Sequence, residues 1–325
     1  HTFANDPERG LFILIFLFIL IFLSIFIFFF FHKDDENKPY SFFWLSKETS
    51  ILINNWFMMY FLSVVLIGTV YPIFLDVISS QKISVGPPFY HKLIIPFLVP
   101  FLLMMAIGPK LRWIKSHLED KIYLISFFII SILLAYYVLE NFNQNILTNT
   151  ILISSALYLF FITIRDFFIK KYKNISQNIA HFGFSLLILS ILLNNLFSDE
   201  IITNLKVGET FENSKTKIVF ESIDQKNEKN YSAIIANFSI RSSNGEEDSL
   251  SPELRIYNQP TIATSEADIR TNLLTDKFIV INLVQNQDYF NVRYQVKPFM
   301  LWIWLSVILI SFGGIVSFLK KHHEK

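Results

Sequence analysis

Two histidines stand where imidazole chemistry would matter most, and the first is His181. It lies about one turn inside an apolar run, NIAHFGFSLLILSILLNN, and Gly183 would let a flat macrocycle come close to the backbone. An ionisable side chain within a membrane span is costly and is a functional hypothesis by default. Neutral imidazole is a common metal ligand, and haem iron takes axial histidine. A histidine hydrogen-bonded near the membrane interface is the alternative, and the residues alone leave both open.

The second histidine, His1, opens the segment HTFANDPERG, which runs directly into an apolar stretch. Asp6, Pro7 and Glu8 favour a turn followed by a helix start, because proline suits an early helical position and acidic groups suit the helix N-terminus. On residue type alone, His1 is an ordinary terminal residue. The chain begins without Met, and its first apolar run lacks the features of a signal peptide, so we expect a cut or processed start.

The sequence lacks the residues that several other kinds of catalytic or binding site require. The chain contains no cysteine, which excludes disulfides, thiolate metal sites and cysteine nucleophiles. It has no Gly-rich phosphate loop, HExxH pair, GxSxG turn or pair of carboxylates within an apolar run, so hydrolase and nucleotide-driven functions are not supported. The net charge of +1 offers no argument for nucleic acid as a partner.

The apolar pattern predicts a polytopic α-helical membrane protein. Apolar residues make up 52% of the 325 residues and charged residues 17%, against about a quarter charged in soluble domains. A helix needs about 20 mainly apolar residues to cross the hydrocarbon core of a bilayer. Seven windows qualify, with the third and fifth the weakest: 11–31, 51–75, 93–109, 122–140, 148–164, 178–197 and 298–319.

Basic residues predict the orientation, because Lys and Arg in short loops stay on the cytoplasmic side. One set of alternate loops holds only Arg9, Lys82 and Lys92. The other set holds fourteen basic residues: Lys33, Lys38, Lys47, Lys110, Arg112, Lys115, Lys121, Arg165, Lys170, Lys171, Lys173, Lys320, Lys321 and Lys325. We therefore expect the N-terminus outside and the C-terminus inside.

One long polar segment separates the sixth and seventh spans. Its apolar residues alternate with period two in 217–223, 231–240, 276–284 and 289–296, with turn signals SNGEED and QNQD between runs. This pattern predicts an antiparallel β barrel or sandwich, outside the membrane in the orientation above. The predicted regions are a membrane region at 1–197 with six spans, an extracytoplasmic β domain at 198–296, and the last span with a basic tail at 297–325.

Two further segments carry a structural and a functional interpretation. Gly86, Pro87 and Pro88 fix the chain between the second and third spans, which favours a structural cap over one wall of an outer-face site. Trp302 and Trp304 fit the aromatic belt that anchors a span, in preference to rings that stack on a porphyrin.

Several segments together resemble the CcmF family, the integral-membrane haem lyase subunit of the multi-component cytochrome c maturation system. In chain order they are HTFANDPERGLFIL, SKETSILINNWF, IGTVYPIFLD, KISVGPPFY, IGPKLRW, IAHFG, PELRIYNQPTIATSEADI and VRYQVKPFMLWIWL. The similarity runs from the first residue nearly to the last and corresponds to roughly the C-terminal half of the family's chain. The resemblance implies a fold of this topology, with the β domain outside.

The resemblance also implies roles for the two histidines. In the family, the histidine at the position of His1 ligates the haem being delivered, and the histidine at the position of His181 ligates a resident haem b within the membrane. The family's Trp-rich outer loop and its other haem-ligating histidines lie upstream of the matching segment. The chain is therefore expected to be a fragment or one product of a split lyase.

Partners and location follow from the same resemblance. The expected partners are apocytochrome c, the haem chaperone CcmE, CcmH- and CcmI-type subunits that handle thiols and hold apocytochrome, the N-terminal half of the lyase if it is split, and membrane lipid. Nucleic acid is not expected. The expected location is the bacterial or mitochondrial inner membrane, with the β domain in the periplasm or intermembrane space.

The expected reaction joins haem vinyl groups to the thiols of a CxxCH motif in apocytochrome c. The protein would supply positioning and redox state, without a catalytic acid–base pair. Two alternatives from other classes stay open. One is a permease, in which Pro96 and Pro100 would break the third span, and the other is a non-catalytic assembly scaffold. Haem-dependent absorbance distinguishes the lyase from both.

Overall fold

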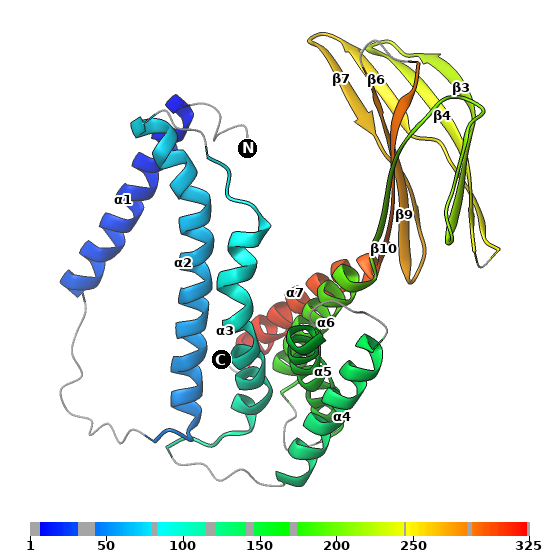
Figure 1. Cartoon of the computed structure of the whole chain (residues 1–325). Helices are drawn as coiled ribbons and strands as arrows, with labels where there is room; N and C mark the ends of the chain where they lie inside the picture. The colour runs from blue at the N-terminus through cyan, green and yellow to red at the C-terminus, as the bar shows by residue number, and fades with distance from the viewer. Residues whose placement is uncertain are drawn as a thin grey trace. The chain divides into compact units, whose positions relative to one another are not determined.

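The computed structural model (Figure 1) describes residues 7–31, 43–79, 83–114, 121–140, 146–169, 174–243, 245–284 and 288–323. Its contacts separate two compact units, residues 1–174 and residues 175–325. The first unit is helical, and the second combines two helices with a β domain. His1 lies outside the described residues.

Five helices and one short 3-10 helix are described in the first unit. They are α1 (Pro7–Phe31), α2 (Lys47–Ser79), α3 (Pro87–Ile107), η2 (Gly108–Lys110), α4 (Lys121–Leu139) and α5 (Ile146–Phe168). Contacts join α1 to α2, α2 to α3, α3 to α5, and α4 to α5. The helix start expected at Pro7 is confirmed.

Helix α3 continues through both of its internal prolines. Pro96 and Pro100 lie inside the helix, so the hypothesis that they break the third span is wrong. Each proline removes one backbone donor, and membrane helices tolerate this where their neighbours satisfy the freed carbonyl groups. Gly86 caps the N-terminus of α3 in an extended conformation and Pro87 stands in its first turn, which agrees with a structural cap.

In the second unit, α6 (Ile175–Phe197) and α7 (Met300–His323) pack closely along their lengths. Glycines make this contact possible. A Cβ atom on Gly183 would lie 3.0 Å from the Ile310 nitrogen and 3.0 Å from the Ser306 oxygen, both backbone atoms. A Cβ atom on Gly313 would lie 2.8 Å from the Ala180 nitrogen. Small residues at such interfaces let the backbones of membrane helices approach.

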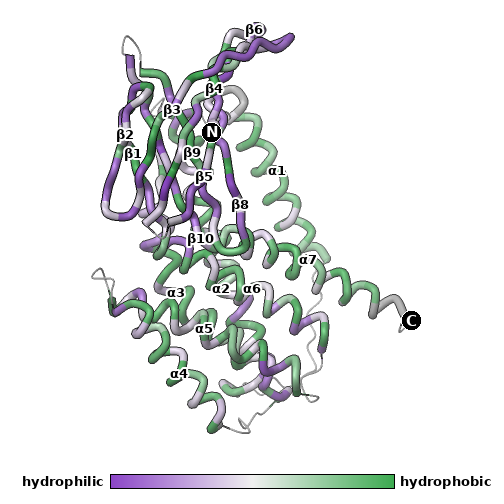
Figure 2. The backbone as a smooth tube through the Cα atoms, turned by 90° about the vertical axis from the view of Figure 1, so that its right-hand side faces the viewer, coloured by the Kyte–Doolittle hydropathy of each residue, from purple (hydrophilic) through white to green (hydrophobic). Residues whose placement is uncertain are grey.

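Seven helices among the described residues are long and apolar enough to cross a membrane, which confirms the predicted fold class. Their apolar stretches are Gly10–Phe31, Lys47–Ser79, Pro87–Lys110, Ile122–Leu139, Ile146–Phe168, Ile175–Phe197 and Met300–Leu319. In Figure 2 these helices are mainly coloured as hydrophobic, whereas the strands mix hydrophobic and hydrophilic residues. The alternation in the strands is typical of a sandwich with one face in water.

The β domain consists of two antiparallel sheets in the described residues. One has the strand order β1-β10-β9-β8, and the other has the order β2-β3-β4-β6-β7 with β5 also paired to β4. The strands are β1 (Asp199–Leu205), β2 (Thr210–Glu212), β3 (Thr216–Asn227), β4 (Tyr231–Ser242), β5 (Glu247–Leu250), β6 (Glu253–Asn258), β7 (Thr261–Glu266), β8 (Asp268–Thr271), β9 (Thr275–Leu283) and β10 (Phe290–Pro298). The four predicted runs correspond to β3, β4, β9 and β10.

Alternate residues of both sheets point into one hydrophobic core. Phe220 of β3 and Phe238 of β4 are fully buried, with stacked rings whose centroids are 4.4 Å apart. Ile279, Ile281 and Val292 cover them from the other sheet and are also fully buried. Because successive strand side chains point to opposite faces, this core explains the period of two in the sequence.

Candidate functional site

His181 lies in the second turn of α6, and its side chain is half-buried. The helix qualifies as a membrane span, so the imidazole stands within an apolar segment. His1, the other predicted ligand, lies outside the described residues. The candidate site is therefore built around His181 and the surface of α6 that carries it.

One face of helix α6 packs on α7, and His181 stands on the other face by helical spacing. Ala180 and Gly183 pack against the backbone of α7. An α-helix has 3.6 residues per turn, so His181 points about 130° away from the direction of that contact. The space beside Gly183 is filled by α7, and the hypothesis that Gly183 admits a macrocycle is wrong.

That other face carries a polar stripe. Asn178, His181 and Ser185 are spaced at i, i+3 and i+7, which places all three on one side of the helix. Asn178 and Ser185 are buried, and the Ser185 hydroxyl donates to the Phe182 carbonyl oxygen at 2.8 Å. Buried polar groups in a membrane helix normally face protein or a bound group, not lipid. Asn178 and Ser185 were missed in the sequence, where their helical spacing to His181 was the available signal.

A single histidine suits haem iron better than an all-protein metal site. Among the described residues, no three His, Cys, Asp or Glu side chains gather where they could share a metal ion. Porphyrin supplies the in-plane nitrogens of haem iron, so the protein needs to contribute only axial ligands. His181 can supply one axial ligand from α6.

Trp302 and Trp304 stand in the first turns of α7 and agree with an anchoring role. The Trp302 indole nitrogen donates to the Leu273 carbonyl oxygen at 2.9 Å, in the turn between β8 and β9. The Trp304 side chain is exposed, as expected for a ring at the membrane boundary.

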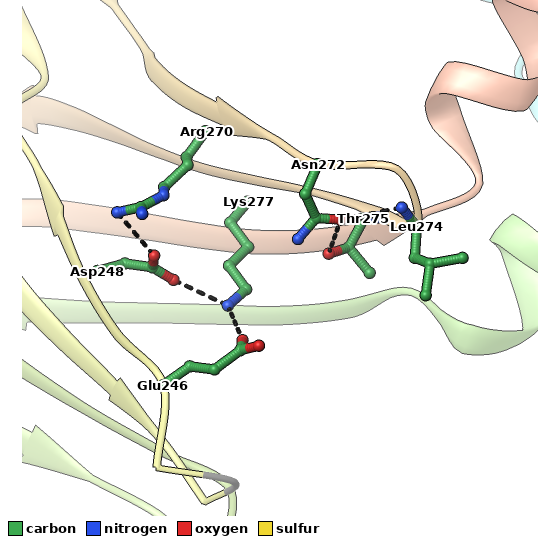
Figure 3. A network of polar contacts seen from close by, with 7 residues as sticks. All are labelled: Glu246, Asp248, Arg270, Asn272, Leu274, Thr275 and Lys277. Atoms are coloured by element: carbon green, nitrogen blue, oxygen red, sulfur yellow. Dashed lines mark hydrogen bonds and ion pairs between the residues drawn. The ribbon is translucent and has the colours of Figure 1, made fainter.

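A second polar cluster lies in the β domain, between the two sheets (Figure 3). The Lys277 ammonium group of β9 contacts Glu246 at 2.7 Å and Asp248 at 2.8 Å, and Asp248 also pairs with Arg270 at 2.9 Å. Burial lowers the pKa of Lys277, but the hydrogen bonds to Asp248 and Glu246 outweigh it and raise this pKa above its usual value. Burial also raises the pKa of nearby Tyr294 to about 12.

The Lys277 cluster joins the sheets and does not offer an unpaired charge. Its two cations face two carboxylates, so the charges balance within the cluster. Cavities of about 310 Å³ and 580 Å³ adjoin it, and both are lined by Glu246, Asn272 and Lys277. We assign the cluster a structural role, as a clamp between β9 and the start of β5.

Comparison with known proteins finds one matching family model and several similar proteins. The family model described as the CcmF C-terminal beta-sandwich matches residues 196–298, from the end of α6 through β10. Cytochrome c-type biogenesis protein CcmF of Pseudomonas fluorescens is 28% identical over 341 residues, which cover 100% of this chain and 51% of that protein. The Escherichia coli protein of the same name is 25% identical over 334 residues, which cover 100% of this chain and 52% of that protein.

Residues 196–298 match the CcmF C-terminal beta-sandwich, and the whole chain is similar to about half of a CcmF protein. A solved structure called Cytochrome c Heme Lyase CcmF shares its fold, with a TM-score of 0.66 and 20% sequence identity. That similarity covers 84% of this chain and 46% of the solved chain. The chain thus spans about half the length of the CcmF relatives that it matches. Resemblance to CcmF, predicted from short motifs, is confirmed.

Proposed function

We propose that the chain forms the C-terminal part of a cytochrome c haem lyase, which attaches haem to apocytochrome c on the outer face of the inner membrane. The observation that carries this proposal is His181, on a polar stripe of a membrane helix whose opposite side packs on α7. The proposal is also supported by the alignment of the whole chain with proteins named for cytochrome c biogenesis. The activity belongs to the complete assembly.

The residues of this chain would bind and orient haem, with no catalytic acid–base pair. His181 would hold the iron of a resident haem b through a neutral imidazole nitrogen, and Asn178 and Ser185 would line the same face. A haem b held there would supply redox chemistry, with which the delivered iron and the cysteine thiols would be kept reduced. His1 would ligate the delivered haem.

Thioether formation balances without a further reactant. A cysteine S–H adds across a haem vinyl double bond, so that sulfur bonds to one vinyl carbon and the hydrogen goes to the other. No net oxidation or reduction accompanies this addition. Without an acid–base pair, the positioning of haem and thiols would be the main contribution to lowering the activation barrier. Proximity alone can lower the barrier by about 7–11 kcal/mol in well-oriented reactions.

The proposed partners are those of a lyase complex: apocytochrome c, the haem chaperone CcmE, CcmH- and CcmI-type subunits, and the N-terminal half of the lyase. The loops rich in Lys and Arg would lie on the cytoplasmic side of the membrane. The β domain would then lie on the opposite side, in the periplasm or intermembrane space. There it would lie on the side where apocytochrome c receives haem.

The deciding experiment is His181→Ala in the complete assembly, with the upstream half present. We expect loss of the b-type bands in the reduced-minus-oxidised visible spectrum and loss of covalent haem on a CxxCH cytochrome. His91→Ala is the matched control, because His91 is an exposed histidine in another span and should leave both signals intact. A b-type spectrum at full intensity in the His181 variant would show that the assignment is wrong.

The role of His1 has its own test. Ligation needs neutral imidazole, whose ordinary pKa is about 6.5, so occupancy by delivered haem should decrease as the pH falls below about 6.5. Unchanged occupancy at about pH 5 would contradict ligation by His1.

A further inference from the structure

One end of the β domain connects to the membrane helices, and the pairing of its strands shows which residues lie there. Strand β1 begins at Asp199 directly after α6, and β10 ends at Pro298 directly before α7. Thr275, the first residue of β9, pairs with Pro298. The turn between β8 and β9, residues 272–274, therefore extends past this pair and lies level with the first residues of α7.

This turn is held in one conformation by its own asparagine. The Asn272 side-chain oxygen accepts hydrogen bonds from the backbone nitrogens of Leu274 at 2.9 Å and Thr275 at 2.7 Å. The Asn272 backbone nitrogen donates to the Thr275 carbonyl oxygen at 3.0 Å, which closes the turn. An asparagine that bonds to the backbone two residues on is a common way to fix a turn.

The turn is also bonded to the start of α7. The Phe299 backbone nitrogen donates to the Leu274 carbonyl oxygen at 2.7 Å, and the Trp302 indole nitrogen donates to the Leu273 carbonyl oxygen at 2.9 Å. The position of the turn along the axis of α7 is therefore fixed by two hydrogen bonds. Since α7 is a membrane span from Met300 to Leu319, the turn stands where that span enters the bilayer.

The two residues at the tip of the turn are leucines whose side chains remain exposed. Leu273 is 71% exposed and Leu274 is 61% exposed. The same leucines line one side of the cavity of about 580 Å³, whose polar wall includes Glu246 and Lys277. Lys277 pairs with Val296, which is two residues farther from α7 than the Thr275–Pro298 pair. The leucine side of the cavity therefore lies nearer to α7 than its polar wall does.

We propose that Leu273 and Leu274 insert into the lipid leaflet nearest the β domain and fix that domain against the membrane surface. Lipid is the occupant that the structure favours, because the turn continues the apolar surface of α7. Trp304, in the next turn of that helix, is 64% exposed, and tryptophan concentrates at the boundary between headgroups and acyl chains. The insertion is independent of haem chemistry and of the direction in which the chain crosses the membrane.

Nitroxide labels on single cysteines test the insertion, and the chain helps because it has no cysteine of its own. Leu273→Cys, Leu274→Cys and the control Ile262→Cys are each labelled in the full chain in lipid nanodiscs. Ile262 of β7 is the control because it is also apolar and exposed. It pairs with Tyr257 of β6, which pairs with Tyr231, the first residue of β4. Ile262 therefore lies at the end of β4 opposite to Ser242. Oxygen collides preferentially with labels in lipid, and a polar nickel chelate with labels in water.

We expect the ratio of oxygen to nickel accessibility to be several-fold higher at Leu273 and Leu274 than at Ile262. Equal ratios at the three positions would overturn the proposal. Low access of both reagents to the turn would also overturn it, because protein would then cover the leucines. A second measurement needs no substitution: a photoactivatable phospholipid should cross-link to the segment 272–275 of the unmodified chain and not to 258–262, and the absence of that preference would count against insertion.

Discussion

Gly313 of α7 lies so close to Ala180 of α6 that a Cβ atom on Gly313 would come within 2.8 Å of the Ala180 backbone nitrogen. Backbone atoms cannot move aside as a flexible side chain can. We therefore predict that Gly313→Val separates the two helices and lowers the thermal stability of the full chain in detergent, by about 1–3 kcal/mol as for other overpacked sites.

The neighbouring glycine provides the control for this prediction. A Cβ atom on Gly314 meets no atom within 4 Å. Gly314→Val should therefore leave the melting temperature close to that of the unmodified chain. Equal losses in the two variants would mean that helix propensity, and not the contact with Ala180, accounts for the effect.

A buried ion pair in the first unit gives a second prediction. The Lys110 ammonium nitrogen lies 2.8 Å and 2.6 Å from the two carboxylate oxygens of Asp166, and the side chains are 2% and 8% exposed. Lys110→Met leaves the Asp166 charge buried without this cation, so we expect the unfolding free energy to fall by about 3–5 kcal/mol. Thermal denaturation in detergent measures the loss.

Two controls show whether burial is the cause. Lys226→Met breaks the exposed pair with Glu228 and should leave the melting temperature close to that of the unmodified chain. The double variant Lys110→Met with Asp166→Leu removes both charges and should recover most of the stability, since apolar groups can replace a buried pair at little cost. A double variant no more stable than Lys110→Met would contradict this account.

The membrane helices were predictable because the bilayer demands long apolar runs, but their ends were not. Helix α2 begins at Lys47 and α3 at Pro87, before the predicted starts at 51 and 93. Backbone hydrogen bonding continues through polar residues that a hydropathy window leaves out, such as Glu48. Pro96 and Pro100 misled for a related reason: a proline weakens a helix locally, and the surrounding span keeps it intact.

In the β domain, the sequence indicated the central strands and missed those with mixed exposure. Strands β3, β4, β9 and β10 each bury alternate residues in the core, so their apolar period is clear. Strand β7 has no fully buried residue, and its sequence TIATSE therefore shows no apolar alternation. Turn signals alone could not identify such a strand.

The candidate site was predicted in part. His181 is recognisable as an ionisable residue in an apolar run, whereas Asn178 and Ser185 are uncharged and become informative only through the helix face that they share with it. The partner of Gly183 could not be predicted, because Ile310 and Ser306 lie more than a hundred residues away, beyond the β domain. Long-range helix pairing leaves no local signal in one sequence.

The stacked phenylalanines of the β domain yield a third prediction. Phe238 is fully buried, and its ring stacks on Phe220 at 4.4 Å. Phe238→Ala opens a cavity in the centre of the sandwich, and we expect a loss of about 3–5 kcal/mol in β-domain stability, measured by near-ultraviolet circular dichroism during denaturation of the full chain. Ile262→Ala, at a residue 51% exposed, should change stability by no more than about 0.5 kcal/mol. Similar losses in both would contradict a core centred on Phe238.

Alkaline pH should weaken the β domain through Lys277 and Tyr294. The pKa of Lys277 is raised, because its bonds to Asp248 and Glu246 outweigh its burial, and burial raises the pKa of Tyr294 to about 12. A raised pKa means that the folded domain holds the proton more tightly than the unfolded chain. The stabilisation is therefore complete below about pH 10 and is lost as the pH rises toward 12.

Chemical denaturation of the full chain between pH 8 and pH 11.5 measures this effect, with the β domain followed by near-ultraviolet circular dichroism. Tyr294→Phe removes the titrating phenol and keeps the ring, so its stability should fall less steeply with pH above about 10. Tyr289→Phe, outside the buried core of the domain, is the control and should follow the unmodified chain. Parallel curves for the chain with and without the Tyr294 hydroxyl would show that this phenol does not supply the alkaline sensitivity.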